Sequence, residues 1–157
     1  MEAIPDSGAN LKSGYVSKSP YLRFNIKFTK TGTHYVWLQG SCQGKDNTAH
    51  VGFKGKAVSS SAAIKLPLSK GWTWSNTRNG GGRATINVTK TGVQTVEVYM
   101  REDGMILRQI VLATSSKYSP TGEAASDSIS SGSSGDNSVT VTGKSFQQKT
   151  DANGLVV

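Results

Sequence analysis

The clearest structural signal in the chain is Gly92-Val-Gln-Thr-Val-Glu-Val-Tyr-Met-Arg-Glu-Asp-Gly-Met-Ile-Leu-Arg-Gln-Ile-Val-Leu112. Residues 94–100 place alternate side chains on opposite faces of an extended chain, and residues 105–112 are rich in Ile, Val and Leu. Both runs have the length and composition of β-strands, and the polar residues 101–104 join them. The stretch therefore predicts a hairpin that combines one core face with one ligand-accessible corner.

Strand patterns of the same kind recur throughout the first two thirds of the chain. Residues 21–28 alternate strictly, because every second side chain is a large apolar one. Shorter runs lie at residues 33–39, 49–53 and 83–88, separated by turns rich in glycine. No apolar stripe with the 3.6-residue period of a helix stands out. We therefore expect an all-β fold, an antiparallel β-sandwich of the jelly-roll type.

Several single residues carry expectations of their own. Trp37 lies in the middle of a strand and is expected in the core, whereas His34 is expected to be a solvated or hydrogen-bonded strand residue and not a metal ligand. The single cysteine, Cys42, permits no internal disulfide and is expected to be a partly buried small residue. Three consecutive glycines, Gly80 to Gly82, predict a flexible loop between strands, because no helix follows that would favour phosphate binding.

Length and charge narrow the classes of partner. At 157 residues the chain suits one domain with a core of its own. The net charge is +8, and residues 1–118 hold 16 Lys and Arg against 6 Asp and Glu, or +10, while the rest carries −2. Such a basic body favours polyanionic partners, or serves solubility alone. No apolar run has the length of a membrane span and this chain shows no signal peptide, so no membrane partner is expected.

Composition divides the chain into three parts. Residues 1–114 form the expected body of the β-sandwich. Residues 115–138 are dominated by Ser, Gly, Asp and Ala and are expected to be a linker. Residues 139–157 hold the strand-like Val139-Thr-Val-Thr142 and a terminal apolar group, and they are expected to complete the sandwich.

Five short motifs link the chain to a known class of module. They are Thr33-His-Tyr-Val-Trp37, His50-Val-Gly52, Gly71-Trp-Thr-Trp-Ser-Asn76, Ala84-Thr-Ile-Asn-Val88 and Met100-Arg-Glu-Asp-Gly104. Through these five motifs, residues 21–112 resemble the β-sandwich carbohydrate-binding modules of families 6 and 35. The resemblance is closer to the module at the C-terminus of family-115 glycoside hydrolases. The resemblance implies a non-catalytic, extracellular module that binds a polysaccharide or oligosaccharide.

The order of the chain departs from the resembling modules. Those modules open with a strand that reads roughly Gly-Leu-Val-Val-Met-Glu-Ala-Glu, whereas here Gly154-Leu-Val-Val157 ends the chain and Met1-Glu-Ala3 begins it. The chain therefore looks circularly permuted, or cut out of phase from a tandem array. Alternatively, the terminal strand completes a sandwich in a neighbouring molecule, or the tail has no fixed structure.

The resemblance also raises the question of a metal. Modules of families 6 and 35 often hold a structural calcium through the opening Glu-Ala-Glu and an Asp of the last strand. The corresponding residues here are Glu2, Ala3 and Ile4 and, in the last strand, Arg108. Because Ile and Arg supply no oxygen ligand, we expect the calcium site to be absent or weakened and no cofactor to be bound. Glu2 is the one retained candidate ligand, and an ion pair with Arg108 is its alternative role.

Candidate sugar-binding residues follow from the chemistry of sugars, which present an apolar C–H face and a ring of hydroxyl groups. Trp72 and Trp74 are the candidate platform, with burial of both in the core as the alternative. The candidate hydrogen-bonding residues are Arg101, Glu102, Asp103, Asn76 and Asn47, with His50 and Arg78 as weaker ones. For Arg101 the alternative is a structural salt bridge within its corner.

Other functions are disfavoured by the same residues. Glu102 and Asp103 are adjacent in sequence and therefore diverge, which does not suit a glycosidase pair, and no nucleophile with a base is recognisable. The basic residues are scattered without the aromatic spacing of an RNA-binding motif, so nucleic acid is not expected. The sequence predicts a non-catalytic carbohydrate-binding module, with acidic glycans as its candidate ligands. A self-assembling subunit that donates its C-terminal strand is the alternative.

Overall fold

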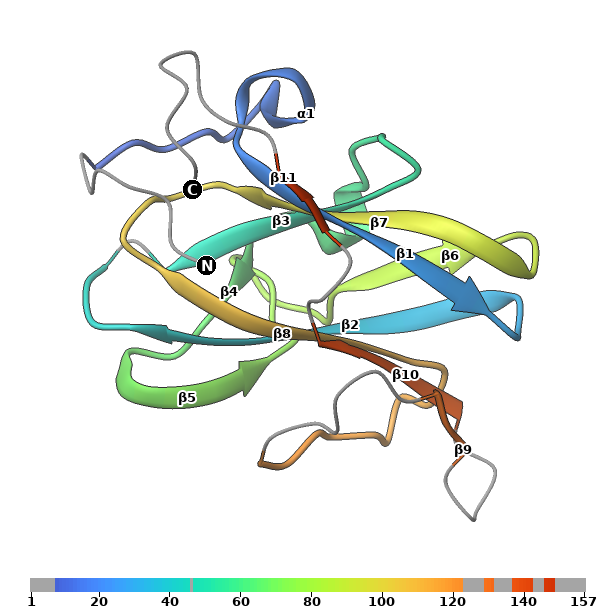
Figure 1. Cartoon of the computed structure of the whole chain (residues 1–157). Helices are drawn as coiled ribbons and strands as arrows, with labels where there is room; N and C mark the ends of the chain where they lie inside the picture. Colours follow the sequence, from blue (N-terminus) through green and yellow to red (C-terminus); the bar gives the residue numbers. More distant parts are fainter. Residues whose placement is uncertain (1–7, 46, 123–128, 132–136, 143–145, 149–157) are drawn as a thin grey trace.

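A computed structural model describes residues 8–45, 47–122, 129–131, 137–142 and 146–148 (Figure 1). These residues are almost entirely β-structure, as the sequence predicts. The helical elements are one four-residue helix, α1 (Tyr15–Lys18), and a 3₁₀ turn, η1 (Ser59–Ser61). The strands are β1 (Tyr21–Phe28), β2 (Gly32–Cys42), β3 (Thr48–Phe53), β4 (Ile64–Lys65), β5 (Ser69–Ser75), β6 (Thr85–Val88), β7 (Gly92–Met100), β8 (Ile106–Ala113), β9 (Ile129–Ser131), β10 (Asn137–Thr142) and β11 (Phe146–Gln148).

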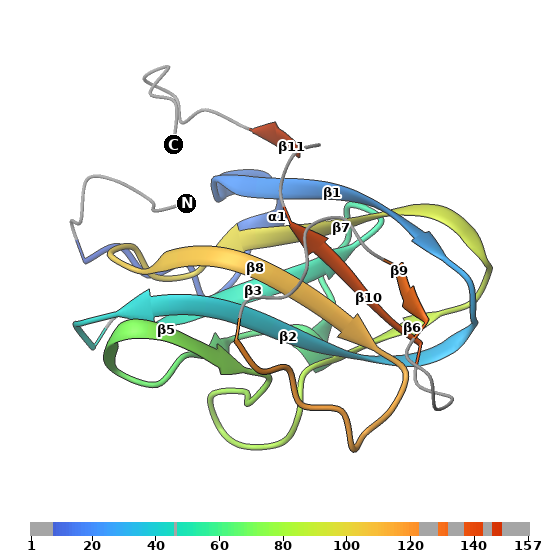
Figure 2. The same cartoon turned by 60° about the horizontal axis from the view of Figure 1, so that its bottom comes forward.

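The strands form two sheets that lie face to face (Figures 1 and 2). The five-stranded sheet has the order β11-β1-β7-β3-β4, and the six-stranded sheet has the order β5-β2-β8-β10-β9 with β6 paired to β2. All of the pairings are antiparallel. The predicted antiparallel β-sandwich is thus confirmed, and its jelly-roll connectivity stays a prediction.

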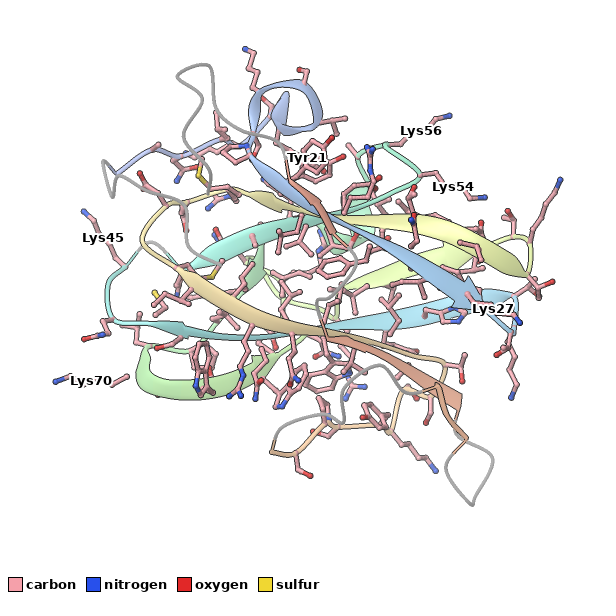
Figure 3. All side chains as sticks on the ribbon, viewed as in Figure 1. Tyr21, Lys27, Lys45, Lys54, Lys56 and Lys70 are labelled. Atoms are coloured by element: carbon pink, nitrogen blue, oxygen red, sulfur yellow. The ribbon has the colours of Figure 1, made fainter. Side chains whose placement is uncertain are left out.

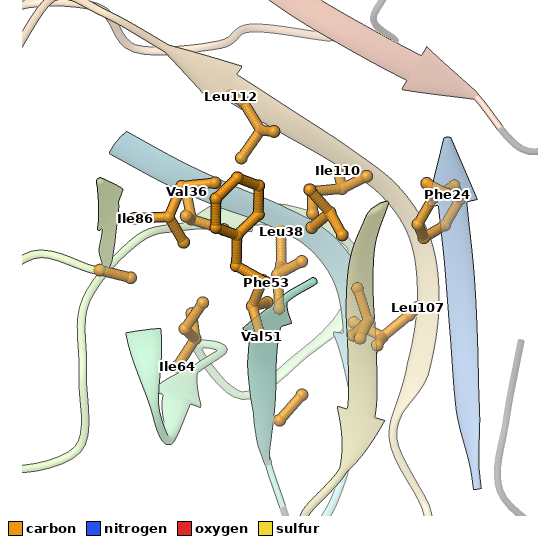
Figure 4. Packing of buried hydrophobic residues seen from close by; sticks show 14 of the residues in the cluster. Phe24, Val36, Leu38, Val51, Phe53, Ile64, Ile86, Leu107, Ile110 and Leu112 are labelled. Atoms are coloured by element: carbon orange, nitrogen blue, oxygen red, sulfur yellow. The ribbon is translucent and has the colours of Figure 1, made fainter. Parts of the chain in front are cut away.

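The core lies between the two sheets (Figure 4). Phe24, Ile26 and Phe28 of β1 point into it, so the alternation of residues 21–28 is confirmed. From the opposite sheet, Leu38 and Ile110 pack against the same cluster. Such complementary apolar faces, each from strands that alternate in and out, are what hold two twisted sheets together.

The predicted hairpin of residues 92–112 is wrong. β7 pairs with β1 and β3 in one sheet, whereas β8 pairs with β2 and β10 in the other. The polar corner at residues 101–104 therefore carries the chain from one sheet to the next. Alternation within each strand was predicted correctly, but it does not reveal which strand becomes the partner.

Three single-residue expectations have clear outcomes. Cys42 keeps 2% of its surface accessible in the core cluster, so it is more deeply buried than expected. His34 is a buried strand residue whose Nδ1 lies 3.1 Å from the Gly32 carbonyl oxygen, which matches the hydrogen-bonded form of its prediction. Trp37 is not part of the core. Its neighbours Val36 and Leu38 point inward, so Trp37 lies on the outer face of the six-stranded sheet.

Three further strands, β9, β10 and β11, are described in the part of the chain after residue 114. β9 and the beginning of β10 fall within residues 115–138, β10 joins β8, and β11 joins β1. The division into body, linker and completing segment stays a prediction. The proposed permutation and strand donation both depend on the two ends of the chain, Gly154–Val157 and Met1–Ala3. These ends lie outside the described residues, so both proposals stay predictions. No helix among the described residues is long and apolar enough to cross a membrane.

Candidate functional site

The sequence-predicted site residues fall into two separate places. Trp72 and Trp74 lie on β5, the edge strand of the six-stranded sheet. Arg101, Glu102 and Asp103 follow β7 and lie in the corner between the sheets. The structure therefore does not place the two groups on one strand or in one turn, and each has its own surroundings.

Trp72 is the exposed aromatic residue of the set. It keeps 46% of its surface accessible, and Leu68, just before β5, keeps 62%. The guanidinium carbon of Arg108 on β8 lies 5.1 Å from the centre of the Trp72 ring. This cation–π contact steadies the ring and places positive charge and N–H donors beside it. The alternative that both tryptophans lie in the core is therefore wrong.

Trp74 has a different environment, although it shares a strand with Trp72. It lies directly opposite Gln39 of β2, and its indole Nε1 donates a hydrogen bond of 2.9 Å to the carbonyl oxygen of Gly122. Gln39 Nε2 donates to the same oxygen at 3.0 Å. In Figure 2 the orange segment that follows β8 runs back along β2 towards β5, which brings Gly122 onto this face. Trp74 is consequently half-buried by the chain's own backbone.

The outer face of the six-stranded sheet continues this aromatic surface. Tyr35 and Trp37 of β2 lie on it, and the Arg83 guanidinium carbon lies 5.9 Å from the Tyr35 ring centre. Arg83 also donates a hydrogen bond to the carbonyl oxygen of Ser116. Trp37 Nε1 is buried and has no hydrogen-bond partner among the described residues. The face is thus aromatic and basic, and residues 115–122 cover part of it.

The corner of Arg101, Glu102 and Asp103 is buried. The prediction that this corner is accessible to a ligand is therefore wrong. Glu102 Oε2 accepts hydrogen bonds from the backbone N–H of Asn47 at 3.0 Å and from the backbone N–H of Thr48 at 3.1 Å. It also accepts one from the Thr48 hydroxyl at 2.7 Å. Its Oε1 accepts from Asn10 Nδ2 at 2.8 Å and from Arg101 Nη1. The structural salt bridge that the sequence left open for Arg101 is present. This carboxylate ties together three segments that are distant in sequence.

Asn47 and Asn76 are buried as well. Asn47 Nδ2 donates to the Leu66 carbonyl oxygen at 2.7 Å, which holds the segment before β3 against the segment after β4. Asn76 follows β5, and its backbone carbonyl oxygen accepts a 2.7 Å bond from the Ala84 amide, while its side-chain Nδ2 is buried without a hydrogen-bond partner among the described residues. Asn47 therefore organises the loops next to the sheets through its side chain and Asn76 does so through its backbone, and contact of either residue with a sugar stays a prediction.

His50 belongs to the structure that surrounds the corner. Its Nδ1 accepts a 3.1 Å bond from the Ala63 amide, so Nε2 carries the proton and donates to the Leu11 carbonyl oxygen at 3.0 Å. The Tyr15 ring of α1 stacks on the imidazole with a centre-to-centre distance of 3.8 Å. His50 thus pins the N-terminal segment to β3 and is not available as a ligand-binding side chain.

The pKa values of this region respond to burial and to hydrogen bonds. Burial lowers the pKa of His50, and the bond to the Leu11 carbonyl oxygen only partly opposes that effect. For Glu102, burial alone would raise the pKa. The Thr48 hydroxyl, the Arg101 charge and the Asn47 amide outweigh it and hold the pKa below its usual value. The fold therefore favours neutral His50 and ionised Glu102.

Acid is expected to destabilise the protein in two stages. Because the pKa of His50 is lower in the folded state, its stabilising contribution is complete above pH 6.5 and is lost as the pH falls through the folded-state value. Glu102 adds a second loss once the pH falls below 4.5. Melting temperatures measured from pH 8 to pH 3 should fall in that order. A melting temperature that rises between pH 7 and pH 5 would contradict this account.

Metal ligation has little support in the described part of the chain. No group of three or more His, Cys, Asp or Glu side chains within the described residues could hold a metal ion. Arg108, at the position aligned with a calcium-binding Asp in the resembling modules, lies over Trp72. Glu2, the other half of the calcium prediction, lies outside the described residues.

Comparison with known proteins places the chain in a family. Residues 2–123 match the sequence profile of the "Glycosyl hydrolase family 115 C-terminal domain". The chain therefore belongs to this family, whose C-terminal domain is a non-catalytic module of a glycoside hydrolase.

The chain is also similar to a curated protein of Formosa agariphila, described as "Uncharacterized protein P23". The two are 30% identical over 118 residues, which is 69% of this chain and 29% of the relative's length. The chain thus spans less than a third of that protein. No solved structure matches.

Proposed function

We propose that the chain is a non-catalytic carbohydrate-binding module that holds a polysaccharide against the surface around Trp72. The observation that carries this proposal is the exposed Trp72 ring on an edge strand, with the Arg108 guanidinium beside it. An indole ring packs against the apolar C–H face of a sugar, and guanidinium N–H groups donate to hydroxyl or carboxylate oxygens. Membership of a family of glycoside-hydrolase accessory domains supports the same role.

The proposal assigns different roles to the residues that the sequence predicts to bind sugar. Trp72 is the stacking platform, and Trp74 extends it with the part of its ring that the Gly122 segment leaves accessible. Arg101, Glu102 and Asp103 support the fold from inside the corner. Asn47 and Asn76 are assigned the same supporting role, because their side chains are buried.

Charge supports acidic polysaccharides as the ligand class. The acidic side chains in the described part of the chain are Glu97, Glu102 and Asp103, and all three are buried. The exposed charges of that part are therefore positive, which attracts uronate or sulfate groups and makes binding sensitive to salt. An extracellular location, implied by the family resemblance, belongs to the same proposal.

The test compares single substitutions of two exposed apolar side chains. Trp72→Ala removes the platform, whereas Leu68→Ala removes an exposed apolar side chain that has no part in the proposed site. Truncation of a tryptophan that anchors a ligand costs about 2 kcal/mol, or roughly a thirtyfold loss of affinity. In affinity gel electrophoresis, Trp72→Ala should lose retardation by the polysaccharide that retards the parent chain, and Leu68→Ala should keep it. Equal retardation of the two variants would refute the assignment of Trp72.

A further inference from the structure

A groove lies at one end of the five-stranded sheet, in the sheet that does not contain Trp72. It has a volume of about 470 Å³ and is lined by Asn25, Lys54, Lys90, Thr91, Val93, Gln94 and Thr95. These residues come from β1, from β7, and from the turns that follow β3 and β6. The groove is therefore separate from the surface around Trp72 in both residues and sheet.

One side of the groove is a rigid turn that carries Lys54. The Lys54 amide donates to the Thr95 carbonyl oxygen at 2.9 Å, and the Gly55 amide donates to both carboxylate oxygens of Glu97 at 3.1 Å. Lys54 adopts a φ of 55°, a conformation that non-glycine residues keep only when their surroundings fix it. Its Nζ lies 5.1 Å from the centre of the Phe53 ring. The turn thus holds the Lys54 ammonium at the edge of the groove.

The other side is the turn between β6 and β7, which carries Lys90. Gln94 Nε2 donates a hydrogen bond to the Lys90 carbonyl oxygen and so fixes this turn from β7. Gln94 Oε1 is buried and has no hydrogen-bond partner among the described residues. Because Gln94 pairs in register with the inward-facing Ile26, its side chain supports the Lys90 turn from the inner face of the sheet and leaves the groove to its neighbours Val93 and Thr95.

The groove combines three kinds of surface. Lys54 and Lys90 supply positive charge, and no acidic residue lines it. Asn25, Thr91 and Thr95 supply polar groups, while Val93, with 69% of its surface accessible, supplies an apolar patch.

The charges next to the groove strengthen its positive character. Lys27 pairs in register with Val93 on the neighbouring strand, and Figure 3 shows Lys27 and Lys54 at the same end of the molecule. The carboxylate of Glu97 is buried and bound by Arg23 at 3.1 Å as well as by the Gly55 amide. Its negative charge is therefore compensated within the protein.

We propose that this groove is a second binding site, which takes an anionic sugar unit of a polysaccharide. The Lys54 and Lys90 ammonium groups bind its carboxylate or sulfate, Asn25 and Thr95 bind hydroxyl groups, and Val93 meets a C–H face. Nucleic acid fits less well, because no aromatic side chain lines the groove to stack on a base. The site does not depend on Trp72, so each site stands or fails separately.

The test uses the full chain with two double variants of equal charge change. Lys54→Gln/Lys90→Gln alters the groove, and Lys12→Gln/Lys65→Gln removes two exposed lysines elsewhere. The probes are oligogalacturonate, which carries carboxylates, dextran sulfate, neutral dextran and a single-stranded oligonucleotide. Loss of two charge-assisted contacts should weaken binding of an anionic saccharide at least about tenfold, and the control should stay within about twofold. Oligogalacturonate and dextran sulfate identify which anion the groove prefers.

Amide chemical shifts decide where the probe binds. A bound saccharide should shift the amides of residues 90–95, and Trp72→Ala should leave these shifts unchanged. The proposal is overturned if neither anionic saccharide binds, if both double variants lose affinity equally, if the shifts lie elsewhere, or if the oligonucleotide binds the groove more tightly than the saccharides. If neither anionic saccharide binds, the acidic ligand class proposed for the Trp72 surface fails as well, whereas the other outcomes leave the role of Trp72 to its own test.

Discussion

Replacing Glu102 by alanine is expected to lower the free energy of unfolding by about 3–5 kcal/mol, because the buried Arg101 guanidinium loses its charged partner and keeps only a hydrogen bond to the Thr48 hydroxyl oxygen. The substitution also removes the acceptor for the Asn47 and Thr48 amides and for the Asn10 side chain. These donors lie in two segments, around Asn10 and at Asn47–Thr48, which Glu102 joins to the residues that follow β7. The loss should appear in urea unfolding as a lower midpoint.

Glu102→Gln is the matched variant, because it keeps the shape of the side chain and removes the charge. It should cost less, about 1–3 kcal/mol, since one carbonyl oxygen remains to accept a bond. A decrease below about 1 kcal/mol for Glu102→Ala would show that the corner is not the structural junction described above. Sugar binding that fails in Glu102→Gln while stability is kept would restore this residue to the binding site.

Leu38→Ala is expected to destabilise the protein by about 2–5 kcal/mol, since it opens a cavity between the two sheets. Leu38 keeps 1% of its surface accessible and belongs to the core cluster with residues of both sheets. The cost combines the lost transfer of the side chain from water with the contacts that its neighbours lose. The same unfolding measurement gives its value.

Leu68→Ala makes the same chemical change on the surface, where 62% of the side chain is accessible. Its effect should stay within about 0.5 kcal/mol. If the two leucine variants were equally stable, the face-to-face packing of the sheets would be contradicted. The comparison also supplies the stability control for Trp72→Ala.

Most of the fold was predictable because strands leave a local signature. The alternation of residues 21–28 fixed the inward face of β1, and the pattern of residues 83–88 did the same for Ala84, Ile86 and Val88. A period of two follows directly from the geometry of an extended chain with one face in a core. It requires no knowledge of the partner strand.

The local signature does not show which strands pair with one another, or which segments of the chain cover the outer face of a sheet. The sequence of β7 and β8 is equally compatible with a hairpin and with a crossing between sheets, and the structure shows the crossing. Trp37 is expected inside because it lies in the middle of a strand, but its neighbours Val36 and Leu38 point into the core, which puts Trp37 on the outer face. Residues 115–122 then cover part of that outer face.

The candidate site shows the same limit. Exposure of a tryptophan in residues 71–76 was predictable from its small and polar neighbours, and Trp72 fits that prediction. The burial of Glu102 was not predictable, because its donors Asn10 and Thr48 lie 92 and 54 residues away. The groove of Lys54 and Lys90 likewise joins two turns far apart in sequence, and no motif indicates it.

The most direct test of the proposed function is affinity gel electrophoresis of the 157-residue chain in native gels that contain neutral or acidic polysaccharides, at low and high salt. Light scattering on the same sample gives its mass. The account predicts selective retardation of a monomer by at least one polysaccharide, with weaker retardation by acidic ones at high salt. A chain that no polysaccharide retards, and that assembles into a particle of many subunits, would contradict the account and favour the self-assembling alternative.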